Sequence, residues 1–148
     1  MAASGEAPPE DIPSLGHMAA TDANPHRRVE AIDLLSGTED PEAVPFLRQA
    51  LSDADVGVRL AVVKSLADAD FPGGAPAELL AMVITTDSDS ENRLEALKVL
   101  TNIDSDQAAV LARQALNDSD EDVRALANQI LESEQQSDPS DGDEQAQD

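Results

Sequence analysis

The chain has 148 residues and carries 31 acidic against 9 basic side chains, for a formal net charge of −22. It contains no cysteine, tryptophan or tyrosine, and only two phenylalanines. The missing thiols exclude disulfides, thiolate metal centres and cysteine nucleophiles. The charge and the scarcity of aromatic rings exclude a basic or base-stacking surface, so we expect no direct nucleic-acid binding. No apolar run reaches the roughly 20 residues that span a membrane, and the N-terminus lacks an apolar signal core, so a cytoplasmic protein without membrane contact is predicted.

The two ends of the chain differ from its middle. Residues 1–11 are mostly small residues, proline and acids, and residues 134–148 hold six acids and almost nothing apolar. Segments of this kind cannot offset the entropy that is lost on ordering. We therefore predict a disordered N-terminal segment (1–11) and a disordered acidic tail (134–148) around one ordered domain, residues 12–133.

A motif returns four times within this domain. The run from Arg48 to Arg59 reappears 65 residues later, from Arg113 to Arg124, with most positions identical. Arg28 and Arg93 follow acidic turns in the same register, so that four arginines stand 31, 34 and 31 residues apart. Each of the four opens the pattern Arg-x-x-[Ala/Val]-x-x-x-Leu. A period of this length in four registered copies indicates a solenoid.

Each repeat is predicted to form two helices. Offsets 0, +3, +4 and +7 from the arginine have the spacing of a buried stripe, which places the arginine on the second helix. Asn24-Pro25 and Asp40-Pro41 are typical helix starts, and Gly37 and Gly73-Gly74 are expected to end elements. The first helices are expected near residues 12–20, 41–51, 76–85 and 106–116. They belong to repeats of about 12–37, 40–70, 75–103 and 105–133, of which the first is degenerate.

The repeated Asp-x-Asp-x-x-Val-Arg run, with Pro-Glu-Ala-Val-Pro at residues 41–45 opening the preceding helix, resembles the HEAT-repeat family. It is most similar to the short HEAT-like repeats named after phycobilisome lyases, over about residues 22–132. The third repeat departs from the pattern, with Thr85 in the place of a leucine and Asn92 in the place of a valine. The resemblance implies an all-α, right-handed α-solenoid of about four HEAT-like helix pairs, whose second helices line a concave recognition surface.

The repeated arginines allow two interpretations. They could bind an anion, but each stands directly after an acidic turn. The resemblance instead implies a structural ladder, in which the arginines pair with turn aspartates of neighbouring repeats. The residues of this expected ladder are Arg28, Arg59, Arg93, Arg124, Asp53, Asp55, Asp87, Asp89, Asp118 and Asp120.

Much of the negative charge has a structural use. Nine acids lie in the turn or first helical turn before a second helix, where carboxylates cap free N–H groups and face the positive helix end. The remaining imbalance, with aspartate favoured over glutamate and only two lysines, suits either adaptation to a high-salt cytoplasm or a surface selected for a basic partner. A protein adapted to salt should lose structure as salt falls.

Candidate catalytic and metal-binding groups are few. The Asp-x-Asp-x-Asp run at residues 118–122 opens like a calcium loop, but Val123 stands where glycine is required. His17 and His26 are the only side chains with an ordinary pKa near neutrality. Some HEAT-like enzymes hold iron through His-Glu pairs, whereas these histidines precede methionine and arginine. We therefore expect no catalytic residue, no metal and no cofactor, and a protein that is not an enzyme.

Offsets +2 and +5 of the second helices point away from the buried stripe. These rows bring both lysines of the chain to neighbouring helices. They are predicted to form a partner-binding face of Glu30, Asp33, Lys64, Glu95, Lys98 and Gln129. The alternative is a solvated face laced by local pairs such as Glu95 with Lys98.

The predicted function is a non-enzymatic protein–protein interaction module or adaptor, monomeric alone, that binds a protein partner on this face. Two alternatives stay open: an accessory subunit of a lyase-type or cofactor-maturation enzyme, and an anionic decoy for a basic nucleic-acid-binding protein. Salt separates the decoy from the adaptor, since binding that rests on charge alone should collapse as salt rises. A fold does not by itself choose among these classes.

Overall fold

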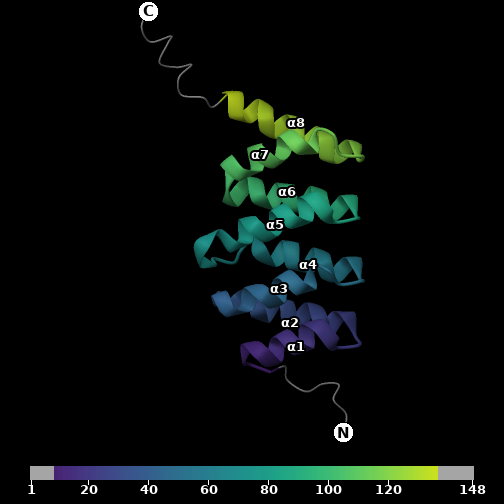
Figure 1. Cartoon of the computed structure of the whole chain (residues 1–148), viewed down its shortest axis with the longest axis vertical. Helices are drawn as coiled ribbons and strands as arrows, with labels where there is room; N and C mark the ends of the chain where they lie inside the picture. The colour runs from purple at the N-terminus through teal and green to yellow at the C-terminus, as the bar shows by residue number, and fades with distance from the viewer. Residues whose placement is uncertain (1–8, 137–148) are drawn as a thin grey trace, which may run out of the picture.

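The computed structural model describes residues 9–136, and every regular element in this part of the chain is helical (Figure 1). Eight α-helices and two short 3-10 turns follow one another along a single stack in the described residues. They are α1 (Ile12–Thr21), α2 (Pro25–Thr38), η1 (Pro41–Ala43), α3 (Val44–Ala50), α4 (Val56–Leu66), η2 (Pro72–Gly74), α5 (Ala75–Thr86), α6 (Ser90–Ile103), α7 (Ser105–Ala115) and α8 (Glu121–Gln136). The predicted all-α class is confirmed.

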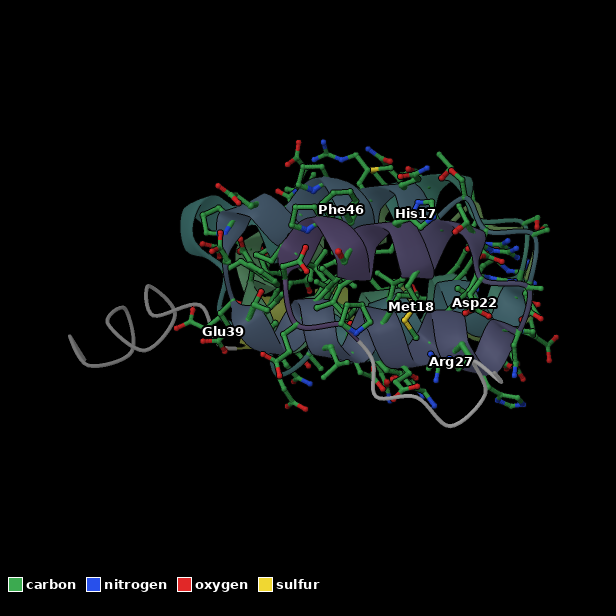
Figure 2. All side chains as sticks on the ribbon, turned by 90° about the horizontal axis from the view of Figure 1, so that it is seen from below. His17, Met18, Asp22, Arg27, Glu39 and Phe46 are labelled. Atoms are coloured by element: carbon green, nitrogen blue, oxygen red, sulfur yellow. The ribbon has the colours of Figure 1, made fainter. Side chains whose placement is uncertain are left out.

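The helices form two layers. The even-numbered helices pack on each other in the order α2, α4, α6 and α8, and each also packs on the odd-numbered helix before it. Figure 2 looks along the stack and shows α1 and α2 in different layers, with Met18 pointing between them. The even-numbered helices are therefore the second helices of four repeats, as the arginine register predicts.

Asparagine and aspartate begin most of the second helices, because their side chains accept the first free N–H groups. Asn24 Oδ1 accepts the N–H two residues along at 2.9 Å, and Asp55 Oδ1 does the same at 2.7 Å. Asp89 caps α6 by accepting an N–H three residues along, at 3.1 Å. The acids in these turns are thus part of the helix starts.

The predicted helix of residues 41–51 is divided in the structure. Asp40 caps the 3-10 turn η1, and the α-helix starts only at Val44. Pro45 has no N–H to donate back to the carbonyl of Pro41, so regular α-helical bonding cannot begin earlier. The 3-10 turn satisfies the first donors of this segment instead, with the Ala43 N–H bonded to the carbonyl of Asp40 at 2.8 Å.

One continuous core lies between the layers, and it ends in polar residues. At offset +4 of the second helices, Ile32, Val63 and Leu97 are fully buried. In the last repeat the same offset is Asn128, which is exposed because no further described helix packs on α8. At the other end, Arg27 stands half-buried at offset −1, where the later repeats bury a valine or an asparagine. Both end faces of the stack are therefore more polar than its interior.

The end of α2 differs from the expectation. The helix continues through Gly37 to Thr38, and the chain reverses at Glu39, which has a positive φ of 53°. Thr38 builds this end, because its hydroxyl donates to the carbonyl of Leu35 at 2.7 Å and accepts the N–H of Asp40 at 3.2 Å. A hydroxyl-bridged turn before a proline therefore ends the helix, and the interpretation of Gly37 as its end was wrong.

The chain turns at Gly73 and Gly74, with φ angles of 78° and 74° that favour glycine, but the pair leads into α5, whose N-cap is Gly74, and does not end an α-helix. The limits of the ordered domain are slightly wider than expected. Asp11 accepts the N–H of Ser14 at 3.0 Å and caps α1, and α8 runs to Gln136 rather than stopping at residue 133. Residues 1–8 and 137–148 of the two predicted disordered ends lie outside the described residues.

Asn92 is the third-repeat residue that departs from the valine pattern, and it lies in the core. Its side chain is 1% exposed, and Oδ1 has no hydrogen-bond partner among the described residues. Nδ2 donates only long bonds, to Asp87 Oδ2 at 3.3 Å and to the carbonyl of Val56 at 3.5 Å. Leaving a buried acceptor without a partner costs about 1–3 kcal/mol.

Replacing Asn92 with valine is therefore expected to raise the free energy of unfolding by about 1 kcal/mol, because it removes the unpaired acceptor and buries apolar surface. Urea denaturation followed by circular dichroism measures the change. Asn128→Val, at an exposed position of α8, is the control and should stay within about 0.5 kcal/mol of the wild type. A loss of stability in Asn92→Val would show that its bond to Asp87 outweighs the orphaned oxygen.

Candidate functional site

A row of arginine–aspartate contacts runs along the edge of the stack where the second helices begin. At Arg28, Nε and Nη2 donate to Oδ2 and Oδ1 of Asp53 at 2.8 and 3.1 Å. Nη1 donates to the backbone carbonyl of Asp22 at 2.7 Å. The guanidinium thus joins the turn of its own repeat to the turn of the next, in a unit that we call a rung. A two-pronged contact of this kind fixes orientation as well as distance.

Two more rungs repeat this geometry. Arg59 donates to Asp87 at 3.0 and 3.3 Å, and Arg93 donates to Asp118 at 2.9 and 2.8 Å. The arginine side chains of the three rungs are 13–16% exposed and the aspartates 2–10% exposed. Three rungs, largely withdrawn from water, therefore link the four repeats in series.

The two aspartates of each turn have different tasks. Asp53 Oδ1 accepts the N–H of Asp55 at 2.8 Å, and the same bond recurs in the next two turns at 2.8 and 2.9 Å. This bond orients the first aspartate toward the arginine of the preceding repeat. The second aspartates accept N–H groups of the following helix and, among the described residues, make no hydrogen bond to arginine: these are Asp55, Asp89 and Asp120. The expected ladder thus separates into rungs and caps.

The rungs change the acidity of their carboxylates. Hydrogen bonds from Arg93 lower the pKa of Asp118, against a smaller opposing effect of burial. Burial is the largest influence on Asp87 and would raise its pKa. Hydrogen bonds from the Asp89 N–H, from Arg59 and from Asn92 together outweigh burial and leave the pKa of Asp87 below its ordinary value. Both carboxylates are therefore held in the charged form.

Acid is expected to remove the stabilisation that Asp118 provides. Its pKa in the folded protein lies below the value of about 4 in an unfolded chain, so the unfolded state binds the proton first as pH falls. The contribution is complete above about pH 5 and is lost as pH falls through the folded pKa. We expect the difference in unfolding free energy between wild type and Asp118→Asn to shrink between pH 7 and about pH 3. A difference that stays constant over this range would contradict the assignment.

The fourth arginine has no carboxylate partner in the described part of the chain. Nη1 of Arg124 donates to the carbonyl of Asp118 at 2.8 Å, as in the other repeats. No described aspartate follows in register to accept from Nε and Nη2. At the opposite end, Asp22 takes part in the ladder although it was not among the predicted residues. Its Asp-x-Asn spacing ahead of Arg28 is the sequence signal that could have identified it.

The six residues of the predicted partner face lie on the second helices. They belong to two rows that run along the stack, with one position of each row on each helix. The row at offset +5 is exposed on all four helices, and the two acids at offset +2 are half-buried beside it. The six are Glu30, Asp33, Lys64, Glu95, Lys98 and Gln129. Although Asp33 is exposed, partial desolvation by the surrounding protein raises its pKa above the ordinary value.

The two lysines differ from the three rung arginines, which are largely buried and paired with aspartates. Among the described residues, neither Lys64 nor Lys98 forms an ion pair, and the alternative local pair of Lys98 with Glu95 is not made. Glu30 instead pairs with Arg27 at 3.7 Å. The face therefore presents two unpaired positive charges on adjacent helices of an acidic protein.

The C-terminal end of the face borders a hollow that sequence reasoning did not find. It measures about 440 Å³ and lies between α6, α7 and α8. Leu126 and Ile130 line it from α8, and Ala109 lines it from α7. At the offset of Leu126 the earlier repeats hold Glu30, Ala61 and Glu95, so a large apolar side chain at this position occurs only in the fourth repeat.

The candidate metal-binding residues do not converge. His17 and His26 are both exposed, and no three His, Asp or Glu side chains in residues 9–136 are placed to hold a metal ion. Figure 2 shows His17 on the outer side of α1, away from Met18 and the core. In the turn at 118–122, Asp118 belongs to a rung and Asp120 caps α8, so both carboxylates are occupied.

These observations define an α-solenoid of stacked helix pairs with an internal arginine–aspartate ladder. Residues 12–82 match the family model of HEAT repeats. The structure of human deoxyhypusine hydroxylase in complex with glycerol superimposes with a TM-score of 0.70 and 20% sequence identity, over 85% of this chain and 44% of that protein. The chain thus spans less than half the length of the hydroxylase, and the likeness shows the HEAT-repeat fold. A search of curated proteins found no match to the sequence.

None of the helices in the described ranges is both long enough and apolar enough to cross a membrane.

Proposed function

We propose that the chain is a non-enzymatic adaptor, a HEAT-repeat interaction module that binds a protein partner on the face of its second helices. The observation that carries this proposal is the pair of exposed lysines, Lys64 and Lys98, which have no ion-pair partner among the described residues. They stand on adjacent helices, whose axes in such packing lie about 8–10 Å apart. A pair of cations on packed neighbouring helices within an acidic surface favours a partner segment with carboxylates at matching spacing.

The repeat type forms part of the same proposal. We assign the repeats to the short HEAT-like type named after phycobilisome lyases, because the Asp-x-Asp-x-x-Val-Arg run recurs in the second and fourth repeats. Repeat stacks of this kind commonly mediate protein interactions through an extended surface.

Charge reversal of both lysines is expected to abolish partner binding without loss of stability. Wild type and Lys64→Glu/Lys98→Glu are used as baits in host lysate at low and at high potassium chloride. Retained proteins are identified by mass spectrometry, and circular dichroism checks that each bait is folded. We expect one partner to be retained stoichiometrically by the wild type at both salts and lost in the variant, because reversed charges repel the partner's carboxylates.

The matched control is Arg48→Glu/Arg113→Glu, which changes the net charge by the same amount in the other layer. These arginines are 45% and 58% exposed and pair with Glu78 and Glu134 at 3.3 and 3.4 Å, and such exposed pairs contribute little to stability. The control should retain the partner. Retention by the lysine variant would place binding elsewhere, and capture of basic proteins alone, released by salt, would favour the anionic decoy.

The two lysines also provide a direct footprint. They are the only lysines of the chain, so an amine-reactive label modifies two side chains and the N-terminus. Binding of the captured partner should protect both Lys64 and Lys98 from the label. Equal labelling in the free and bound states would contradict the assignment of the face.

A further inference from the structure

The ladder has a donor end and an acceptor end. At Arg124, the bond from Nη1 to the carbonyl of Asp118 holds the guanidinium as in the three rungs, but no described carboxylate accepts from Nε and Nη2. At Asp22, Oδ1 accepts the N–H of Asn24 at 2.9 Å, the same bond that orients the first aspartate of every later turn. No arginine of a preceding repeat reaches Asp22 in the described structure. The Asp22 carboxylate makes a longer ion pair with Arg27 of its own repeat, from Oδ2 to Nε at 3.8 Å.

The three rungs specify what Arg124 would bind. In each of them, Nε and Nη2 receive the two oxygens of one aspartate, and that aspartate also accepts an N–H two residues along. The required ligand is therefore a carboxylate already oriented by its own turn. The Asp22 turn has this geometry, and it lies at the far end of the same chain.

We propose that Arg124 of one copy binds Asp22 of a second copy, so that the chains stack end to end through a fourth rung. The contact joins two different surfaces, so each added copy leaves one donor end and one acceptor end open. Association then proceeds to chains of increasing length rather than stopping at a dimer. The chain is therefore expected to be monomeric only in dilute solution.

The composition of the two end faces makes this contact weak and reversible. Asn128 is exposed where the other repeats bury isoleucine, valine or leucine, and Arg27 is half-buried where later repeats bury valine or asparagine. An interface between such faces gains little from apolar burial and resembles transient, polar contacts. Most of its specificity comes from the rung.

The salt dependence follows from the charge of the whole chain. Two copies of net charge −22 repel each other, and salt screens this repulsion over distances beyond about 10 Å at 0.1 M. A rung that is largely withdrawn from water, as the other three are, is screened much less. Association should therefore rise with potassium chloride, opposite to the behaviour of ordinary surface ion pairs.

The test uses the purified chain alone and so is independent of the proposed adaptor function. Sedimentation velocity is measured over a range of protein concentrations at about 0.1 M and about 2 M potassium chloride. We expect the average mass to increase with concentration at high salt, without a plateau at two copies. A wild-type chain that stays monomeric at millimolar concentration in high salt would overturn the proposal.

Two single variants identify the contact. Arg124→Ala removes the donor end, and Asp22→Asn removes the charge of the acceptor end while leaving an oxygen for the Asn24 N–H. Each alone should weaken association by more than about tenfold, because truncating one partner of a hydrogen-bonded charge pair at an interface speeds dissociation. Arg124→Lys keeps the charge but not the two-pronged geometry, and should lose association as well.

An equimolar mixture of the two variants is the decisive arm. Arg124→Ala keeps only its acceptor end and Asp22→Asn keeps only its donor end, so together they can form one wild-type contact and no more. The mixture should give a 1:1 dimer at a potassium chloride concentration at which each variant alone is a monomer. Circular dichroism confirms that both variants are folded. Unchanged association of either variant alone, or no dimer in the mixture, would show that another surface is used.

Discussion

Replacing Asp87 with alanine is expected to lower the free energy of unfolding by about 3–5 kcal/mol, the range for removing one partner of a buried ion pair. The Asp87 side chain is 2% exposed and accepts bonds from Arg59, from the N–H of Asp89 and from Asn92. Alanine leaves the Arg59 guanidinium, 14% exposed, without its counter-charge. The buried positive charge without a partner accounts for most of the expected loss.

Asp87→Ala should also make unfolding of the repeat stack less cooperative. The Arg59–Asp87 rung joins the second repeat to the third, and the stability of a repeat stack is roughly a sum of repeat and interface terms. Weakening the middle interface should let the two halves unfold at different urea concentrations. Circular dichroism is the suitable probe, since the chain has no tryptophan or tyrosine. A broadened or two-step transition is expected, with a lower apparent m value.

Two further variants make this result interpretable. Asp68→Ala removes an exposed aspartate and should stay within about 0.5 kcal/mol of the wild type. Asp87→Asn keeps an oxygen for the Asp89 N–H but loses the charge, so its stability should fall between those of Asp87→Ala and the wild type. If Asp87→Ala and Asp68→Ala proved equally mild, the ladder would have no role in holding the repeats together.

The ladder also shows how far the sequence allows prediction. The spacing of Arg28, Arg59 and Arg93 is enough to place all three on second helices, because a registered period leaves only one helical face for them. The spacing does not reveal which of the two aspartates in a turn receives the guanidinium. That choice depends on the bond from the N–H of Asp55 to Asp53, a property of the folded turn.

Helix ends were harder to predict than helix faces. Gly73 and Gly74 adopt the positive φ that favours glycine, but Gly74 is the N-cap of α5, so the pair leads into a helix and does not end one. At Gly37 the chain stays helical, because the Thr38 hydroxyl and the proline after Asp40 determine the end instead. Composition alone cannot distinguish these situations, since each depends on which side chain bridges the turn.

The candidate site also has some features that the sequence predicted and others that it did not. The helical period was sufficient to bring Lys64 and Lys98 to one exposed row, because the period applies to every repeat. The hollow beside Leu126 and Ile130 was not predictable from that period, since it is lined by residues of three helices, α6, α7 and α8. Features that follow the repeat could be predicted, and features that distinguish one repeat from the others required the structure.

Replacing Gly16 with alanine is expected to destabilise the first repeat by about 1–3 kcal/mol, the cost of overpacking a close contact. A Cβ at Gly16 of α1 would collide with the ring of Phe46 on α3. Figure 2 shows Phe46 in the same layer as α1, and α1 and α3 pack directly. The collision must outweigh the gain of up to about 1 kcal/mol that alanine offers over glycine inside a helix.

Gly37 provides a control with the opposite sign. It lies inside α2 with nothing within 4 Å of an added Cβ, so Gly37→Ala should stabilise the protein by up to about 1 kcal/mol through helix propensity alone. The pair of variants thus separates propensity from packing with one chemical change. Urea denaturation gives both free energies, and hydrogen exchange should show faster opening of α1 in Gly16→Ala only.

A second substitution should rescue the first. Leucine occupies the position of Phe46 in the fourth repeat, as Leu111, so Phe46→Leu keeps an apolar side chain of that layer while shortening it. In the Gly16→Ala background it is expected to restore part of the lost stability, although in the wild type it removes packing and destabilises. Contacting residues show such non-additivity, whereas independent sites do not. Additive effects of Gly16→Ala and Phe46→Leu would contradict the packing of α1 against α3. They would indicate that the contacts of α1 with α2 stabilise the first repeat instead.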